Sequence, residues 1–230
     1  MRIQGLQKLT LLDFPERVAC TVFFAGCNFR CPFCHNASLV VDIPPQADVT
    51  EEEFFSFLKK RQGILDGVCI TGGEPLLQPN IEEFIRKIKD LGFAVKLDTN
   101  GSFPEKLKVL VAKGLVDYVA MDIKNCPEAY GVTAGVQDLD VSSIIKSVSY
   151  LQEGHVPFEF RTTVVKGYHT KESFEKIGQW LQGTERYFLQ NFVDSGDLIG
   201  KDTKGCSEEE MKEFLAIVSE YVPSVKIRGI

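Results

Sequence analysis

Three cysteines, Cys27, Cys31 and Cys34, lie so close together in the sequence that their thiols share one short loop. Soft thiolate ligands favour an iron–sulfur cluster, with zinc as the competitor. Four thiolates would complete a structural zinc site or a four-iron cluster, whereas three leave one coordination position open. The loop therefore predicts a metal centre with an open position, which is where a metal site does chemistry.

Polar motifs recur further along the chain, each after an apolar run. The first is Thr71-Gly72-Gly73-Glu74-Pro75, in which the glycines let the backbone approach a ligand closely and Glu74 can pair with an ammonium group. Asp98-Thr99-Asn100-Gly101 and Asp122-Ile123-Lys124 follow later runs. These motifs are candidates for binding a ligand beside the metal centre.

Short apolar runs alternate with amphipathic segments along nearly the whole chain. Strands are predicted over residues 18–24, 68–71, 93–98, 117–122, 157–165, 186–190 and 225–227. Helices are predicted over residues 50–62, 80–91, 104–113, 140–152, 170–182 and 207–221. Six strand–helix units with short links imply a parallel sheet, and six units suffice for an open barrel. The predicted fold is α/β, a partial (β/α)6 open barrel in a single domain spanning residues 1–230.

All the motifs follow predicted strands and therefore belong to the carboxyl-terminal rim, where ligand sites form in such folds. The remaining cysteines are scattered. Cys20 and Cys69 fall within apolar strands and are predicted to be core residues. Cys126 and Cys206 fall in rim loops, where a second cluster is an alternative to free thiols.

The composition narrows the range of possible functions further. The net charge is −6 and no basic run stands out, which argues against nucleic acid as a partner. No window reaches the roughly 18 apolar residues of a membrane helix, and the first residues lack the apolar run of a signal peptide. We expect a cytoplasmic protein. In a reducing compartment, seven cysteines indicate metal ligands and free thiols, not disulfides.

The cysteine loop and the Gly-Gly-Glu-Pro turn together resemble the motifs of the radical S-adenosylmethionine (SAM) enzymes. In that family three cysteines hold a [4Fe–4S] cluster, and SAM chelates the open iron. Cys34-His35-Asn36 and the motifs at 98–101 and 122–124 resemble those of the glycyl-radical-enzyme activases, which include the pyruvate formate-lyase activating enzyme. Leu9-Thr10-Leu11-Leu12-Asp13-Phe14-Pro15, together with the cysteine-containing run at 26–36, is most similar to the activating protein of anaerobic ribonucleoside-triphosphate reductase.

The resemblance implies a role for each motif. Cys27, Cys31 and Cys34 would hold the cluster. Phe33 and His35 would lie against the nucleoside of SAM, Gly73 and Glu74 at its amino group, and Lys124 at its carboxylate. The full set expected to contact SAM is Phe33, His35, Gly72, Gly73, Glu74, Asp98, Asn100, Asp122, Ile123, Lys124 and Arg161. Asp98, Thr99 and Asp122 would hold a monovalent cation, and Asn191 is a substitute contact on the sixth strand.

The resemblance also implies an activity, reductive cleavage of SAM to form a glycyl radical on a partner enzyme. The expected partner is anaerobic ribonucleoside-triphosphate reductase, with flavodoxin or ferredoxin as electron donor. One alternative is activation of another glycyl radical enzyme, of the pyruvate formate-lyase type. Another is a small-molecule radical SAM enzyme such as 7-carboxy-7-deazaguanine synthase, whose cysteine loop usually continues with an acidic residue where this chain has His35-Asn36. An electron carrier without catalysis is a further alternative.

Overall fold

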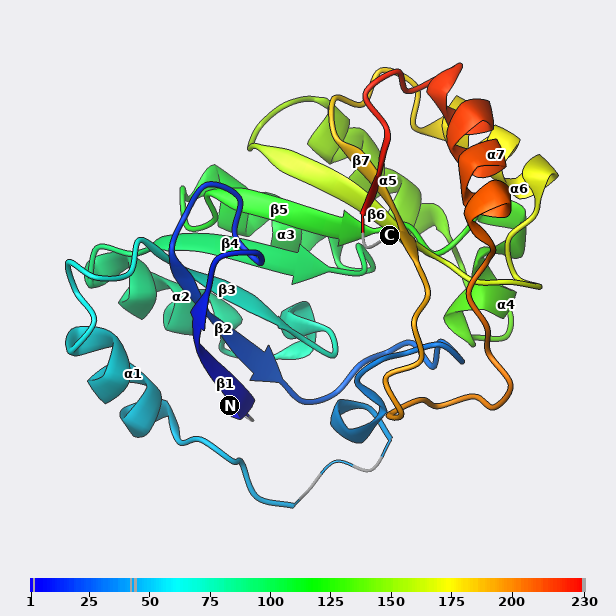
Figure 1. The fold of residues 1–230 in the computed structure, drawn as a ribbon. Coiled ribbons are helices and arrows are strands. Elements are labelled where there is room, and N and C mark those ends of the chain that lie inside the picture. The colour runs from blue at the N-terminus through cyan, green and yellow to red at the C-terminus, as the bar shows by residue number, and fades with distance from the viewer. Residues whose placement is uncertain (2, 42, 44, 229–230) are drawn as a thin grey trace.

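Eight strands form one sheet whose spatial order follows the order along the chain, in a computed structural model that describes residues 1, 3–41, 43 and 45–228 (Figure 1). From β2 to β8 neighbouring strands are parallel, whereas β1 is antiparallel to β2. The strands are β1 (Ile3–Thr10), β2 (Ala19–Phe24), β3 (Gly67–Gly72), β4 (Ala94–Thr99), β5 (Tyr118–Asp122), β6 (Phe158–Val164), β7 (Tyr187–Asn191) and β8 (Lys226–Arg228).

Helices alternate with the strands and lie on the outer side of the curved sheet (Figure 1). They are α1 (Glu51–Lys59), α2 (Ile81–Asp90), α3 (Pro104–Ala112), α4 (Tyr130–Ala134), α5 (Ser142–Gln152), α6 (Lys171–Trp180) and α7 (Glu208–Ser219), with short 3-10 turns η1 (Ala37–Leu39), η2 (Pro75–Leu77) and η3 (Pro127–Ala129). The six strand–helix units from β2 to α7 confirm the predicted architecture. Within the described chain no pairing joins the edge strands β1 and β8, so the barrel is open.

Local sequence explains most of these elements. β2, β3 and β5 are almost continuous buried runs, as expected for parallel strands covered on both faces. In α2 the buried residues Ile81, Phe84, Ile85 and Ile88 recur at helical spacing and face the sheet. Among the described helices, none is long and apolar enough to cross a membrane.

The sequence prediction misses β1 and α4. β1 contains Gly5, has three exposed residues in succession (Gln7, Lys8 and Leu9) and lacks the alternation that marks a half-buried strand. It forms because its backbone pairs with β2. α4 is only five residues long and ends at Gly135 in a left-handed conformation. A helix of that length depends on the packing around it.

A buried ion pair attaches the last strand to the middle of the sheet. Glu159, on β6, is 2% exposed, and its carboxylate accepts two hydrogen bonds from the Arg228 guanidinium on β8, at 2.9 and 3.0 Å. The Tyr118 hydroxyl on β5 donates a third, at 3.1 Å. β8 has only three residues and is paired with β7, so this ion pair adds an attachment to β6, the strand beyond β7.

Replacing Glu159 by alanine is therefore expected to lower the free energy of unfolding by about 2–3 kcal/mol, because it leaves the partly buried Arg228 without its partner. Urea denaturation followed by circular dichroism measures the loss. Glu172→Ala is the matched control, since its carboxylate pairs with Lys176 on the exposed face of α6 and exposed pairs contribute little. Equal losses in the two variants would contradict the anchoring role.

Candidate functional site

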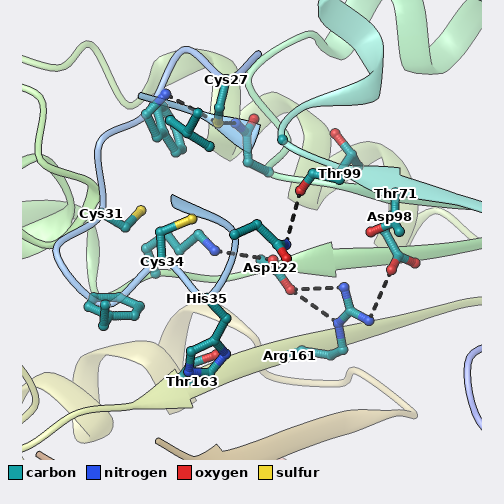
Figure 2. A pocket seen from close by; sticks show the side chains of 18 of the residues that line it. Cys27, Cys31, Cys34, His35, Thr71, Asp98, Thr99, Asp122, Arg161 and Thr163 are labelled. Carbon is teal, nitrogen blue, oxygen red and sulfur yellow. Dashed lines mark hydrogen bonds and ion pairs between the residues drawn. The ribbon is translucent and has the colours of Figure 1, made fainter. Parts of the chain in front are cut away.

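The cysteine loop (residues 25–35) begins directly after β2. Its shape is fixed from within, because the N–H of Cys34 donates to the carbonyl of Cys31 at 3.0 Å and the Arg30 guanidinium donates to the carbonyl of Cys27 at 2.6 Å. Figure 2 shows the side chains of Cys27, Cys31 and Cys34, which line one cavity. The loop thus presents three free thiols to a common space.

Two neighbouring segments hold this loop from outside. The N–H of Arg30 donates to the carbonyl of Ala134 in α4 at 2.9 Å, and the N–H of Gly200 donates to the carbonyl of Pro32 at 2.7 Å. A Cβ at Gly200 would lie 2.7 Å from the Cβ of Pro32, so the segment before α7 packs directly against the loop. These contacts come from parts of the chain far from the cysteines in sequence.

Gly72, the last residue of β3, and Gly73 bring their backbone against the start of the cysteine loop. The N–H of Gly73 donates to the carbonyl of Phe24, and the N–H of Glu74 donates to the carbonyl of Gly26, both at 2.8 Å. A Cβ at Gly73 would lie only 2.0 Å from the Gly26 oxygen, and Gly72 has a φ of +118°, which favours glycine. Both positions therefore require glycine, and both line the cavity.

Glu74 lies behind the cavity wall. It is 0% exposed, and its carboxylate accepts hydrogen bonds from the N–H of Leu76 (3.0 Å), the hydroxyl of Thr99 (2.9 Å) and the N–H of Asn100 (2.7 Å). Burial raises the pKa of Glu74 to about 7. The carboxylate joins the ends of β3 and β4 and does not line the cavity. Ile123, also 0% exposed, lies behind the wall as well.

Five charged side chains, here called the ion chain, alternate in sign beside the cavity; four of them line it, and Lys96 is buried next to Asp98. The Lys96 ammonium pairs with the Asp98 carboxylate on β4. The Arg161 guanidinium on β6 reaches Asp98 at 3.4 Å and Asp122 at 3.0 Å (Figure 2). The Lys124 ammonium lies 3.1 Å from the second oxygen of Asp122. Three cations and two anions leave one net positive charge.

The ion chain keeps its members ionised. Burial acts against the charge on Asp122, but the neighbouring cations Lys124 and Arg161 lower the pKa of Asp122 to about 2. Burial likewise opposes the charge on Lys124, and the Asp122 carboxylate overcomes it, so that the pKa of Lys124 lies above its ordinary value. Arg161 and Lys96 lower the pKa of Asp98 against the effect of its burial. The cavity wall is therefore a fixed array of charges.

The cavity has a volume of about 430 Å³. All the residues predicted to bind the cluster, SAM or the cation line it, apart from Glu74 and Ile123. The predicted residues that line it are Cys27, Cys31, Phe33, Cys34, His35, Gly72, Gly73, Asp98, Thr99, Asn100, Asp122, Lys124 and Arg161. Asn191 does not line it, because its side-chain amide is bonded to the backbone of Cys206 at 2.8 and 2.9 Å.

Sequence reasoning misses several cavity residues. Thr163 and Gln190 lie near the carboxyl ends of β6 and β7, and the two-residue period of a strand could have pointed to them. Thr71, which begins the Gly-Gly-Glu-Pro motif, lines the cavity too. Asp13, from the turn between β1 and β2, also lines the cavity, with its carboxylate bonded to the Thr21 hydroxyl. Asp13 belongs to the Leu9–Pro15 motif, but nothing in that motif indicates a place at the cavity, because its position depends on the pairing of β1.

The sequence also gives no indication of the structural role of His169. It is 5% exposed, its Nε2 lies 2.8 Å from the carbonyl of Lys124, and its Nδ1 accepts from the N–H of Val165 at 3.1 Å. The ring therefore holds the backbone of Lys124 against the end of β6. Burial lowers the pKa of His169, which favours the neutral ring that this bonding pattern requires.

The cavity suits an iron–sulfur cluster with one open position. Burial raises the pKa of Cys31 to about 11 and also raises the pKa of Cys27, so these thiols need a bound cation to become thiolates. Within the described residues, no three His, Cys, Asp or Glu side chains are placed to hold a single metal ion. The cysteines instead surround a space large enough for a bigger group, and soft thiolate donors match iron–sulfur chemistry.

The other cysteines take no part in this cavity. Cys20 and Cys69 are 0% exposed in β2 and β3, in agreement with their prediction as core residues. Cys126 and Cys206 are also buried, and neither lines the cavity. No metal-binding group of the described residues includes them.

Comparison with known proteins agrees with this geometry. A profile of the radical SAM superfamily matches residues 21–181. A candidate glycyl-radical enzyme activating enzyme of Methanocaldococcus jannaschii is 32% identical over 234 residues, which covers 99% of this chain and 96% of that protein. The pyruvate formate-lyase-activating enzyme of Staphylococcus aureus is 25% identical over 195 residues, covering 80% of this chain and 76% of the relative.

Among solved structures, Streptococcus suis SuiB bound to S-adenosylmethionine superposes with a TM-score of 0.69 at 15% identity, covering 91% of this chain and 52% of SuiB. The chain thus spans about half the length of SuiB, and at this identity the likeness concerns the fold alone. The superfamily match and the relative that aligns along almost the whole chain identify the family. The chain belongs to the radical SAM superfamily of enzymes and, within it, is related to the glycyl-radical enzyme activating enzymes.

Proposed function

We propose that this protein is an activase that uses SAM and a [4Fe–4S] cluster to generate a glycyl radical on a partner enzyme. The observation that carries the proposal is the cavity itself, in which three thiols of one loop face the Gly-Gly turn and the charged end of the ion chain. Similarity to a candidate activase along 99% of the chain supports it.

The cofactors supply the reactive chemistry. A [4Fe–4S] cluster held by Cys27, Cys31 and Cys34 would supply the electron that cleaves SAM into methionine and a 5′-deoxyadenosyl radical, and transfer of a hydrogen atom from a glycine Cα of the partner would give 5′-deoxyadenosine and the glycyl radical. The chain's own residues bind and orient the cofactors and exclude water from the site. Burial of Cys31 and Phe33, 7% and 4% exposed, keeps water from much of this loop.

Individual residues fit the parts of SAM. The one net positive charge of the ion chain, with Lys124 at its end, suits the SAM carboxylate. His35 stacks on Phe192 with ring centroids 5.1 Å apart, and Phe33 packs edge-on against Tyr168 at 5.8 Å, which gives an aromatic wall for the nucleoside. Gly73 has no side chain, so the SAM amino group can lie close to its backbone.

The monovalent cation stays a prediction. Asp98, Thr99 and Asp122 line the cavity together, but Lys96, Arg161 and Lys124 already neutralise the two carboxylates. A cation would have to enter between paired groups when SAM binds. Replacing sodium and potassium by choline in the assay lowers SAM cleavage if the cation is required and leaves it unchanged if the three basic side chains suffice.

The first-choice partner is anaerobic ribonucleoside-triphosphate reductase, and the support is the Leu9–Pro15 motif, which resembles its activating proteins. A partner of the pyruvate formate-lyase type is the second candidate, favoured by the Staphylococcus aureus relative. Flavodoxin or ferredoxin would supply the electron. The open edge between β1 and β8 suits entry of a loop from another protein.

The enzyme assignment makes a direct prediction. Protein loaded with iron and sulfide and reduced with dithionite should release 5′-deoxyadenosine and methionine from SAM, as measured by chromatography. Cys27→Ala, Cys31→Ala and Cys34→Ala should each abolish release, because each removes a cluster ligand. Cys126→Ala should retain it, since Cys126 lies outside the cavity. Failure of the loaded wild-type protein to cleave SAM would refute the assignment and leave only electron transfer.

Lys124→Met should weaken SAM binding at least tenfold while cluster content is retained, because it removes the cation at the open end of the ion chain (about 1.4 kcal/mol or more). Titration of SAM into cluster-loaded protein measures the affinity. Lys106→Met is the control, as its ammonium bonds to the Leu76 carbonyl and not to the cavity. Unchanged affinity in Lys124→Met would exclude the proposed contact.

The partner assignment is tested by mixing reduced, SAM-loaded protein with candidate enzymes. We expect a glycyl radical signal by electron paramagnetic resonance on anaerobic ribonucleoside-triphosphate reductase. A signal on pyruvate formate-lyase alone would move the assignment to the second candidate. Turnover of a small molecule such as the precursor of 7-carboxy-7-deazaguanine, without a radical on any protein, would overturn the activase proposal.

A further inference from the structure

Asn100 lies between the turn after β4 and the cysteine loop. It is 6% exposed, and its side-chain Nδ2 donates a hydrogen bond to Asn28 Oδ1 at 2.9 Å. The same Nδ2 lies 3.8 Å from the sulfur of Cys27, within hydrogen-bonding range for sulfur. The Asn100 side-chain amide thus donates both to Asn28 in the cysteine loop and to a thiol that would bind the cluster.

The direction in which this amide points is fixed by Ser102. The backbone N–H and the hydroxyl of Ser102 both donate to Asn100 Oδ1, at 2.9 and 2.6 Å. Asn28 Nδ2 in turn donates to the Ser102 hydroxyl oxygen at 2.9 Å. Because the amide oxygen accepts two bonds from Ser102, the NH2 group must face Asn28 and Cys27. A flipped amide would leave the Ser102 N–H facing an NH2 group and without its acceptor.

Cys27 differs from the other two cysteines in the hydrogen-bond donors that reach its sulfur. Its sulfur also accepts from the backbone N–H of Phe29 at 3.4 Å. Within the described residues, no such donor reaches the sulfur of Cys31 or Cys34. The hydrogen bonds to sulfur are therefore concentrated on one ligand, and only the one from Asn100 comes from outside the cysteine loop.

We propose that Asn100 is a positioning residue that raises the reduction potential of the cluster through its hydrogen bond to Cys27. The inference rests on the proposed function only in requiring a cluster on the three cysteines. Reduction of [4Fe–4S]2+ to [4Fe–4S]+ by one electron adds negative charge that spreads onto the thiolate sulfurs. An N–H donor stabilises that charge, so the reduced state becomes easier to reach.

Two variants remove the donor. Asn100→Leu has a side chain of similar size with no N–H, and Asn100→Asp keeps an oxygen for Ser102 while losing the NH2 group. The potential of the reconstituted cluster is measured by redox titration with dithionite, without SAM or partner, and followed by electron paramagnetic resonance. We expect both variants to titrate at more negative potential than the wild type, and Asn100→Asp furthest because it also adds a negative charge.

Asn28→Ala is the matched control. It removes the other partner of Asn100 Nδ2 but leaves Ser102 to orient the amide toward Cys27, so the potential should stay at the wild-type value. Iron content and circular dichroism accompany each titration. Loaded Asn100 variants with an unchanged potential would overturn the proposal. So would a shift of equal size in Asn28→Ala, which would indicate general loosening of the loop.

Loss of the cluster from both Asn100 variants would show a structural role instead, and that also overturns the proposal. The result of the redox titration does not depend on whether the protein is an activase. A wild-type protein that takes up no cluster contradicts the proposed function, whereas a protein with a loaded cluster and no partner activation leaves the potential measurement fully interpretable.

Discussion

The ion chain of Lys96, Asp98, Arg161, Asp122 and Lys124 is the constraint on which the arrangement of the site depends. Charges held away from water are strongly unfavourable unless each has a partner, and here every inner member has one on either side. The pairs cross from β4 to β6 and back to the end of β5. They therefore hold three neighbouring strands together and leave one net positive charge at the cavity.

The second constraint is close approach of backbone to backbone. The turn that contains Gly72 and Gly73 packs against the carbonyls of Phe24 and Gly26, which begin the cysteine loop. α4 and the segment around Gly200 hold the same loop from the other side. Because main-chain contacts fix the loop on both sides, the thiols can keep their positions before any cofactor binds, which lowers the ordering cost of binding.

The structure distinguishes features that are common to all reactions of this fold from features that would adjust the chemistry of this protein. The radical SAM fold supports many reactions, and the features common to them, three thiols and a place for SAM, lie on the rim of the barrel. Features that would adjust the chemistry come from other loops of the same rim. The Asn100 amide reaches Cys27 from the turn after β4, and His169 holds the backbone of Lys124 from the loop after β6.

Much of the fold and of the site was predictable from the sequence alone. Apolar periodicity gave the six strand–helix units, and the carboxyl ends of parallel strands meet at one edge, so the motifs at Cys27, Gly73, Asp98 and Lys124 had to converge. The sequence could not show that Lys96 is buried, because a lysine in a strand is ordinarily exposed. The strand β1, the entry of Asp13 into the cavity, the recessed position of Glu74 and the bond from Asn100 to Cys27 were likewise decided by tertiary structure. Each depends on which side chains meet across the barrel, whereas local spacing specifies only the elements that carry them.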